Sequence, residues 1–154
     1  VNDENRKTAV NALKMAGVYE KIGKLSNKEE SILTKEFDKD GVLLSGGETQ
    51  KVTISRLFAR DFDIAVLDEP SSALDPVAES KMYDALIEGT KGKTVIYISH
   101  RLSSATRSDN ILVFNKGVLA EQGNHDKLME DNGYYQEMFT LQASGYKEVF
   151  EDEE

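Results

Sequence analysis

Apolar residues recur at three- and four-residue spacing in two stretches of the first sixty residues. The pattern predicts an amphipathic helix over 3–16, which Gly17 would terminate, and a second helix from Gly46 to about Arg60. The stretch between them, 18–41, is charged and mixed, with weak strand or turn character at 32–34.

Three short apolar runs follow, at 64–67, 95–98 and 111–114, and the first two are separated by a helical pattern over 77–87. Runs that are apolar throughout are typical of strands buried on both faces of a parallel sheet. The predicted fold class is therefore α/β, with a mainly parallel sheet flanked by helices.

The last third of the chain predicts a hairpin and two helices. The turn sequence at 115–117 (Asn-Lys-Gly) predicts that 118–121 returns antiparallel to the preceding strand. Helices are expected over 125–130 and 134–143. The apolar residues of the second helix predict a packing face: Tyr134, Tyr135, Met138, Phe139 and Leu141.

Composition narrows the possible chemistry. The 154 residues suit one domain, and the absence of Cys excludes disulfides, iron–sulfur clusters and cysteine-zinc sites. No apolar run approaches the roughly 18 residues of a membrane helix, and no signal peptide is visible. The first residue is not Met, which suggests that an upstream segment is missing.

The formal net charge is −9, and five of the last seven residues are acidic. We expect residues 148–154 to form a solvated, disordered acidic tail. The remaining charge is also negative, which argues against binding to nucleic acid or anionic membranes.

Two acids, Asp68 and Glu69, follow the apolar run at 64–67. Ligands of open parallel sheets bind beyond the carboxyl ends of the strands. Asp68 suits Mg²⁺, which keeps several of its waters, and Glu69 suits the polarisation of an attacking water. The alternative is that the two acids end a strand and begin a turn with Pro70.

A Ser and two glycines open the second predicted helix. Ser45, Gly46 and Gly47 leave backbone N–H groups free and allow an oxyanion to approach closely. The alternative is a helix cap, in which Ser45 and Glu48 form a capping box.

These motifs, in this order, resemble those of ABC-type ATPases. The run 44–50 is similar to the signature motif, 64–69 to the Walker B strand and 72–75 to the D-loop, and His100 follows 95–99 as the family's switch histidine does. The resemblance covers about 41–142 and implies a P-loop NTPase-like fold whose helical subdomain is partly represented at the N-terminus.

The resemblance implies ATP and Mg²⁺ as cofactors and head-to-tail pairing with a second ABC ATPase domain, identical or not. Asp68 would serve Mg²⁺, Glu69 would act as general base, and His100 would contact the γ-phosphate. The residues assigned to nucleotide binding or to coupling across the shared interface are Ser45, Gly46, Gly47, Glu48, Gln50 and Asp75.

The phosphate-binding loop of such ATPases is missing. Gly92, Lys93 and Thr94 match only its end, because position 87 is Ile and the triplet precedes a strand. We therefore expect an incomplete domain: 1–60 as helical subdomain and signature helix, 61–147 as core sheet and C-terminal helices, and 148–154 as the tail. The isolated chain should be inactive.

Further residues resemble those of exporter-type ABC proteins. In such proteins a transmembrane domain usually precedes the cytoplasmic ATPase domain on the same chain. These residues are Ser99–Ser103, Asp109, Gly117, Glu121–Gly123, His125, Leu128, Gly133 and Tyr135. His125 itself is expected to be a capping or surface residue.

The leading interpretation is a segment of an ABC exporter that drives transport at the cytoplasmic face of a membrane. Two alternatives remain: an ABC-type ATPase acting on nucleic acid, and a non-hydrolysing partner that supplies only the signature face. The first alternative lacks support for two reasons. ABC-type ATPases of chromosome maintenance and repair have coiled-coil heptads before the signature motif, and residues 1–41 have none. The translation-factor branch typically has Asn-His in the D-loop, where this chain has Ser-Ala at 72–73.

Overall fold

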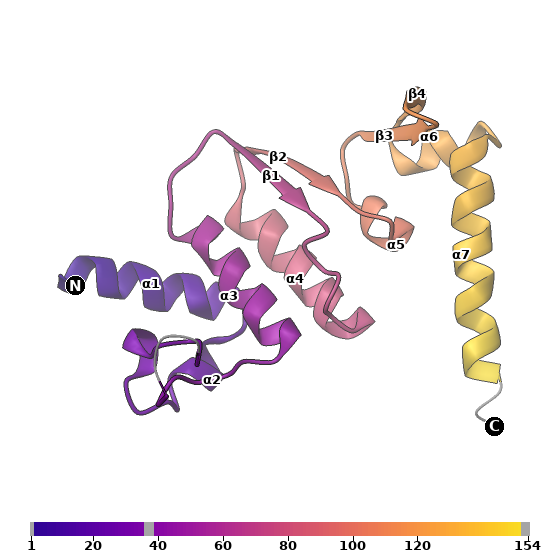
Figure 1. The fold of residues 1–154 in the computed structure, drawn as a ribbon. Coiled ribbons are helices and arrows are strands. Elements are labelled where there is room, and N and C mark those ends of the chain that lie inside the picture. The colour runs from indigo at the N-terminus through magenta and orange to yellow at the C-terminus, as the bar shows by residue number, and fades with distance from the viewer. Residues whose placement is uncertain (1, 36–38, 152–154) are drawn as a thin grey trace. The chain divides into compact units, whose positions relative to one another are not determined.

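The computed structural model describes residues 2–35 and 39–151, with side chains up to residue 144. The chain divides into two compact units, one ending at Ile98 and the other beginning at Ser99 (Figure 1). Both units combine helices with a two-stranded sheet, so the α/β class is confirmed.

The first unit begins with helices. Helix α1 (Asp3–Met15) is capped by Asn2, whose side chain accepts a hydrogen bond from the Asn5 N–H at 2.8 Å. The positive φ of Gly17 (66°) turns the chain into α2 (Tyr19–Ile22), and the short 3-10 helix η1 (Lys28–Glu30) follows. Of the strand or turn expected at 32–34, no strand forms in this described stretch, where the Val42 N–H donates to the Ile32 carbonyl at 2.8 Å.

The sheet of this unit is parallel. Helix α3 (Gly46–Phe58) leads to strand β1 (Ile64–Asp68), and α4 (Pro76–Gly89) leads to β2 (Thr94–Ile98). The register pairs each residue of β1 with the residue 30 positions later in β2, from Ile64 opposite Thr94 to Asp68 opposite Ile98. The triplet 92–94 is a turn into β2, as predicted.

Helix α3 lies between two apolar clusters. On one side Ile54 packs with residues of α4 and the sheet, and the buried members of that cluster are Ile54, Leu74, Met82, Tyr83 and Leu86. On the other side Val52 contacts a cluster built on Leu13, Val18 and Ile22. Since the signature segment opens α3, both clusters hold that segment in place.

The second unit contains α5 (Leu102–Ala105) and the strands β3 (Ile111–Asn115) and β4 (Val118–Gly123). The two strands pair antiparallel, as the turn sequence predicts. Helices α6 (His125–Glu130) and α7 (Tyr134–Glu151) follow.

The core of the second unit surrounds Tyr135, which is fully buried among Ile111, Val113 and Leu128. Its hydroxyl lies 2.9 Å from Nδ1 of His125, whose ring also contacts Phe139. The expectation that His125 is a cap or surface residue is wrong, because Asn124 caps α6 and the imidazole packs on aromatic rings.

The packing face predicted for α7 is correct only in part. Met138 and Phe139 pack against the core around Tyr135, but Tyr134 is 37% and Leu141 65% exposed. A helix presents only about half of its circumference to one core.

The sheet predictions need two corrections. The described strands form two separate two-stranded sheets, one parallel and one antiparallel, instead of one mainly parallel sheet. Side chains also alternate between faces, and one face of β1–β2 is uncovered in the described residues: Ile64 and Val66 are each 64% exposed, and Ile98 is 53% exposed. The apolar runs are therefore buried on one face only.

Helix α7 continues to Glu151, beyond the expected start of a disordered tail at 148. Glu has a high helix propensity, so a run of acidic residues does not by itself end a helix. Residues 152–154 lie outside the described part of the chain. No helix among the described residues has the length and apolarity to cross a membrane.

The core around α4 gives a direct stability test. Leu86 is 4% exposed, whereas its neighbour Ile87 is 48% exposed. Leu86→Ala should lower the free energy of unfolding by about 2–5 kcal/mol in urea titrations, because it removes buried methyl groups and leaves a cavity. Ile87→Ala should change it by about 0.5 kcal/mol. Equal losses in the two variants would contradict this packing.

Candidate functional site

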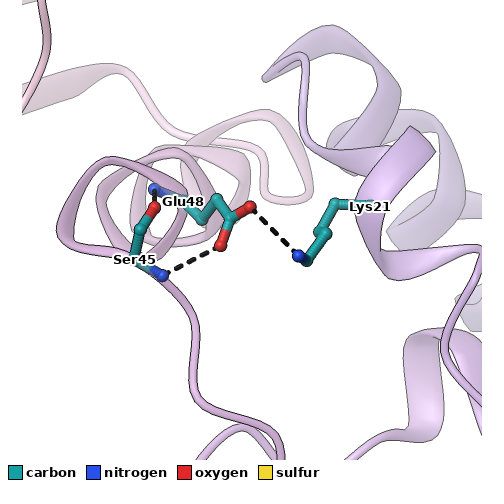
Figure 2. A network of polar contacts seen from close by, with 3 residues as sticks. All are labelled: Lys21, Ser45 and Glu48. Atoms are coloured by element: carbon teal, nitrogen blue, oxygen red, sulfur yellow. Dashed lines mark hydrogen bonds and ion pairs between the residues drawn. The ribbon is translucent and has the colours of Figure 1, made fainter.

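The first turn of α3 forms a capping box. The Ser45 hydroxyl accepts a bond from the Glu48 N–H at 3.2 Å, and the Glu48 carboxylate accepts one from the Ser45 N–H at 2.9 Å (Figure 2). The capping alternative is thus confirmed for these two residues. It does not compete with anion binding, since the remaining N–H groups of the first turn still need partners.

The carboxylate of Glu48 is also tied to α2. Lys21 Nζ lies 3.6 Å from its second oxygen (Figure 2). The Ser45 N–H, and then Lys21, lower the pKa of Glu48, so the carboxylate is ionised at neutral pH. Because Lys21 is half exposed, the ion pair contributes at most about 1 kcal/mol. The assignment of Glu48 to nucleotide binding stays a prediction, and both of its oxygens already have local partners.

The two glycines of the signature segment lie against the turn that follows β1. A Cβ at position 47 would come within 3.2 Å of the Ala73 carbonyl oxygen and of the Leu74 side chain, and one at Gly46 within 3.5 Å of the Ala73 side chain. Neither glycine has a positive φ. The close approach disfavours a side chain at Gly47, whereas the contact at Gly46 is an ordinary one.

Gln50 joins the same two segments by hydrogen bonds. Its Nε2 donates to the Glu69 carbonyl at 3.1 Å and to the Ser72 hydroxyl at 3.2 Å. Its Oε1 accepts the Ala73 N–H at 3.0 Å. One amide therefore fixes the backbone on both sides of this turn. The sequence assigned Gln50 to nucleotide binding; the structure gives its amide a positioning role, and a nucleotide contact stays a prediction.

The two acids after the strand differ in environment. Asp68 ends β1 with an exposed side chain, whereas Glu69 is half-buried and has φ of 47°. Its N–H donates to the Ile98 carbonyl at 3.0 Å and its carbonyl accepts from Gln50. A non-glycine residue with positive φ costs about 1–3 kcal/mol, and such strain clusters at functional sites. Hydrogen bonds at its N–H and at its carbonyl, together with the packed turn, hold Glu69 in this conformation.

The end of the turn is secured by caps. Asp75 caps α4 by accepting the Ala78 N–H at 2.8 Å, and that bond lowers the pKa of Asp75. Buried Ser71 donates to buried Glu79 of α4 at 2.6 Å. The role of Asp75 in coupling two nucleotide sites stays a prediction.

His100 belongs to the second unit, directly after the division between the units. Its side chain is exposed, and its backbone carbonyl accepts a bond from Nε2 of Gln142 at 2.6 Å, while the Leu102 N–H donates to the same amide. Gln142 of α7 thus fixes the segment that carries His100.

Several exporter-type residues have structural explanations in the second unit. The carboxylate of Glu121 accepts the N–H groups of Tyr134 and Tyr135 and so caps α7. A Cβ at Gly133 would lie 2.1 Å from that carboxylate, so a larger residue there would displace the Glu121 side chain from its cap. These residues therefore have a structural role at the start of α7.

The donor set for Mg²⁺ is small. No group of three or more metal-ligating side chains occurs in the described part of the chain. Asp68 alone, exposed at the carboxyl edge of the parallel pair, fits an ion held by one or two carboxylates, waters and substrate phosphates. It does not fit an all-protein metal cage.

Sequence reasoning missed the positioning contacts. Nothing in the spacing indicates that Gln50 reaches the turn after β1, or that Ser71 pairs with Glu79, since both contacts depend on the packing of α3 and α4. The only available signal for Gln50 is its place one helical turn beyond Gly46.

The amide of Gln50 can be tested by hydrogen exchange. Gln50→Ala should speed exchange of the Ala73 amide about fivefold, which corresponds to about 1 kcal/mol for one lost hydrogen bond. Thr53→Ala is the matched control, because the Thr53 hydroxyl donates to the Thr49 carbonyl within α3. Unchanged Ala73 exchange in Gln50→Ala would show that the amide does not hold the turn.

Comparison with known proteins supplies relatives over nearly the whole chain, although no model of a protein family matches it. An ATP-dependent lipid A-core flippase of Haemophilus influenzae is 38% identical over 92% of this chain. P-glycoprotein 14 of Caenorhabditis elegans is 38% identical over 97%, and ABC transporter B family member 14 of Arabidopsis thaliana is 39% identical over 88%.

A solved structure of a bacterial Atm1-family ABC exporter with ATP bound is also similar, with a TM-score of 0.79 and 36% identity over 90% of this chain. The chain spans only part of these relatives: 23% of the flippase, 11% of P-glycoprotein 14 and 24% of the Atm1-family exporter. Over nearly its whole length, the chain is therefore similar to one part of ABC exporters.

Proposed function

We propose that the chain is the C-terminal part of the ATPase domain of an ABC exporter, which uses ATP binding and hydrolysis to drive transport. One observation carries the proposal: the signature segment, the two strand-end acids and the turn after them form a single body, joined by Gly47 and Gln50. The exporter relatives along the chain support it.

The first turn of α3 provides the phosphate contact. Gly46 and Gly47 present backbone N–H groups at a helix N-terminus, where the dipole favours an anion by about 0.3–1 kcal/mol. The Ser45 N–H is used by Glu48, but the Ser45 hydroxyl can still donate its proton. In the proposed assembly, these groups contact the γ-phosphate of ATP held by a second ATPase domain, identical or not, that pairs head to tail.

The end of β1 provides the chemistry. Glu69 polarises the attacking water as general base, and its backbone conformation is fixed by Gln50 and Ile98. Asp68 would hold Mg²⁺, which would supply charge neutralisation at the phosphates. His100 contacts the γ-phosphate, and Asp75 couples the two sites across the interface.

The rest of the ATPase domain and a transmembrane domain come from chain outside these 154 residues. The relatives are about four or more times longer than the segment they share with this chain. Exposed Ile64, Val66 and Ile98 on one face of β1–β2 support a further layer of protein there, since exposed apolar patches mark interaction sites. The assembled protein acts at the cytoplasmic face of a membrane.

The isolated chain should hydrolyse no ATP, because it has no Gly-Lys-Ser or Gly-Lys-Thr loop that follows a strand and opens a helix. The same absence favours a second candidate function, a non-hydrolysing subunit that supplies only the signature face to another ATPase.

The test uses the complete protein. Glu69→Gln should slow magnesium-dependent ATP hydrolysis by about 10²–10⁴-fold, the usual contribution of a general base, while ATP binding persists. Glu88→Gln, an exposed acid on α4, is the matched control and should leave turnover unchanged. Normal turnover in Glu69→Gln would remove Glu69 from this role and favour the signature-only alternative.

A further inference from the structure

The side-chain amide of Gln142 bonds to the backbone on both sides of Arg101. Its Nε2 donates to the His100 carbonyl at 2.6 Å, and its Oε1 accepts the Leu102 N–H at 3.0 Å. Leu102 is the first residue of α5, and the first N–H groups of a helix have no partner within that helix. Gln142 therefore gives this N–H an acceptor from a different helix, and with the same amide holds the carbonyl of His100.

The residue between these two bonds is held by hydroxyl groups. The Arg101 N–H donates to the Ser99 hydroxyl at 3.0 Å, and the Arg101 carbonyl accepts from the Ser104 hydroxyl at 2.6 Å. Four consecutive backbone polar groups, from the His100 carbonyl to the Leu102 N–H, are thus bonded to side chains. The His100 side chain itself is exposed. A backbone fixed in this way holds an exposed functional side chain close to one position.

Gln142 reaches this segment because of its place on α7. It follows Tyr135 by seven residues, which is about two helical turns, so the two residues lie on the same face of the helix. Tyr135 is fully buried, and Met138 and Phe139 pack against the same core as Leu102 of α5. This shared core sets the distance between α5 and α7 at which the amide can bond to both sides of Arg101.

We infer that Gln142 is a positioning residue for His100, through which the docking of α7 controls the contact that His100 makes with the γ-phosphate. The inference rests on the proposed function for the role of His100. The placement of a group against the reacting phosphoryl acts on the transition state. Loss of the Gln142 amide should therefore lower kcat and leave the KM for ATP unchanged.

The test measures steady-state ATP hydrolysis by the complete protein. Gln142→Ala should lower kcat about tenfold at unchanged KM, which is the scale of two lost hydrogen bonds. His100→Ala should lower kcat further. Adding Gln142→Ala to His100→Ala should then cause no additional loss, because residues that act as one unit are not additive.

The matched control is Gln136→Ala, the same substitution on the same helix. The Gln136 amide donates to the Thr140 hydroxyl of α7 at 3.4 Å, so its removal should leave kcat unchanged. Thermal unfolding verifies that each variant is folded.

Hydrogen exchange distinguishes positioning from a general loosening of the second unit. In Gln142→Ala the Leu102 amide should exchange about fivefold faster, whereas the Arg101 amide, which is bonded to Ser99, should be unchanged. Gln142→Glu keeps an acceptor for the Leu102 N–H, but its ionised carboxylate has no donor for the His100 carbonyl. This variant should retain the protection of Leu102 and lose kcat as Gln142→Ala does.

Three results would overturn the inference and leave the proposed function standing. They are a normal kcat in Gln142→Ala, a further loss when Gln142→Ala is added to His100→Ala, and faster exchange throughout the second unit in Gln142→Ala. Normal turnover in His100→Ala would instead remove His100 from the proposed function, and the inference would fall with it.

Discussion

The close approach of the first turn of α3 to the turn after β1 is the constraint on which the rest of the site depends. Any side chain at Gly47 would press on the Ala73 carbonyl and Leu74 within 3.2 Å. At this separation the amide of Gln50 reaches Glu69, Ser72 and Ala73. Gly47 thus serves packing, and the positive φ of Glu69 is maintained by the contacts that this packing allows.

The elements themselves could be predicted from the sequence because periodicity records local burial. The helices at α1, α3 and α4 and the strands β1 to β4 lie where the pattern placed them, within a few residues. Strand burial could not be predicted in the same way. The strands that contain Val66 and Ile98 were predicted to be buried on both faces of the sheet. The side chains of these two residues are nevertheless more than half exposed. An apolar run indicates that a strand is covered, and it does not indicate by which chain.

In the candidate site, too, local features could be predicted from the sequence and contacts between elements could not. Residue type and order located the signature segment and the strand-end acids, and the Ser45–Glu48 capping box follows from spacing alone. The role of Gln50 and the burial of Ser71 with Glu79 depend on how α3 and α4 pack, which no local pattern encodes. The prediction that His125 is a cap or surface residue was wrong for that reason, because its partner Tyr135 lies on the next helix, α7.

In the proposed function, the chain is part of an ATPase domain, and further protein covers its sheet and completes its nucleotide site. The most direct test is the size and location of the native polypeptide, measured by immunoblot of cell fractions with an antibody against residues 148–154. The account predicts a membrane-bound band much larger than the 17.2 kDa of this chain. A soluble band at 17.2 kDa would contradict it.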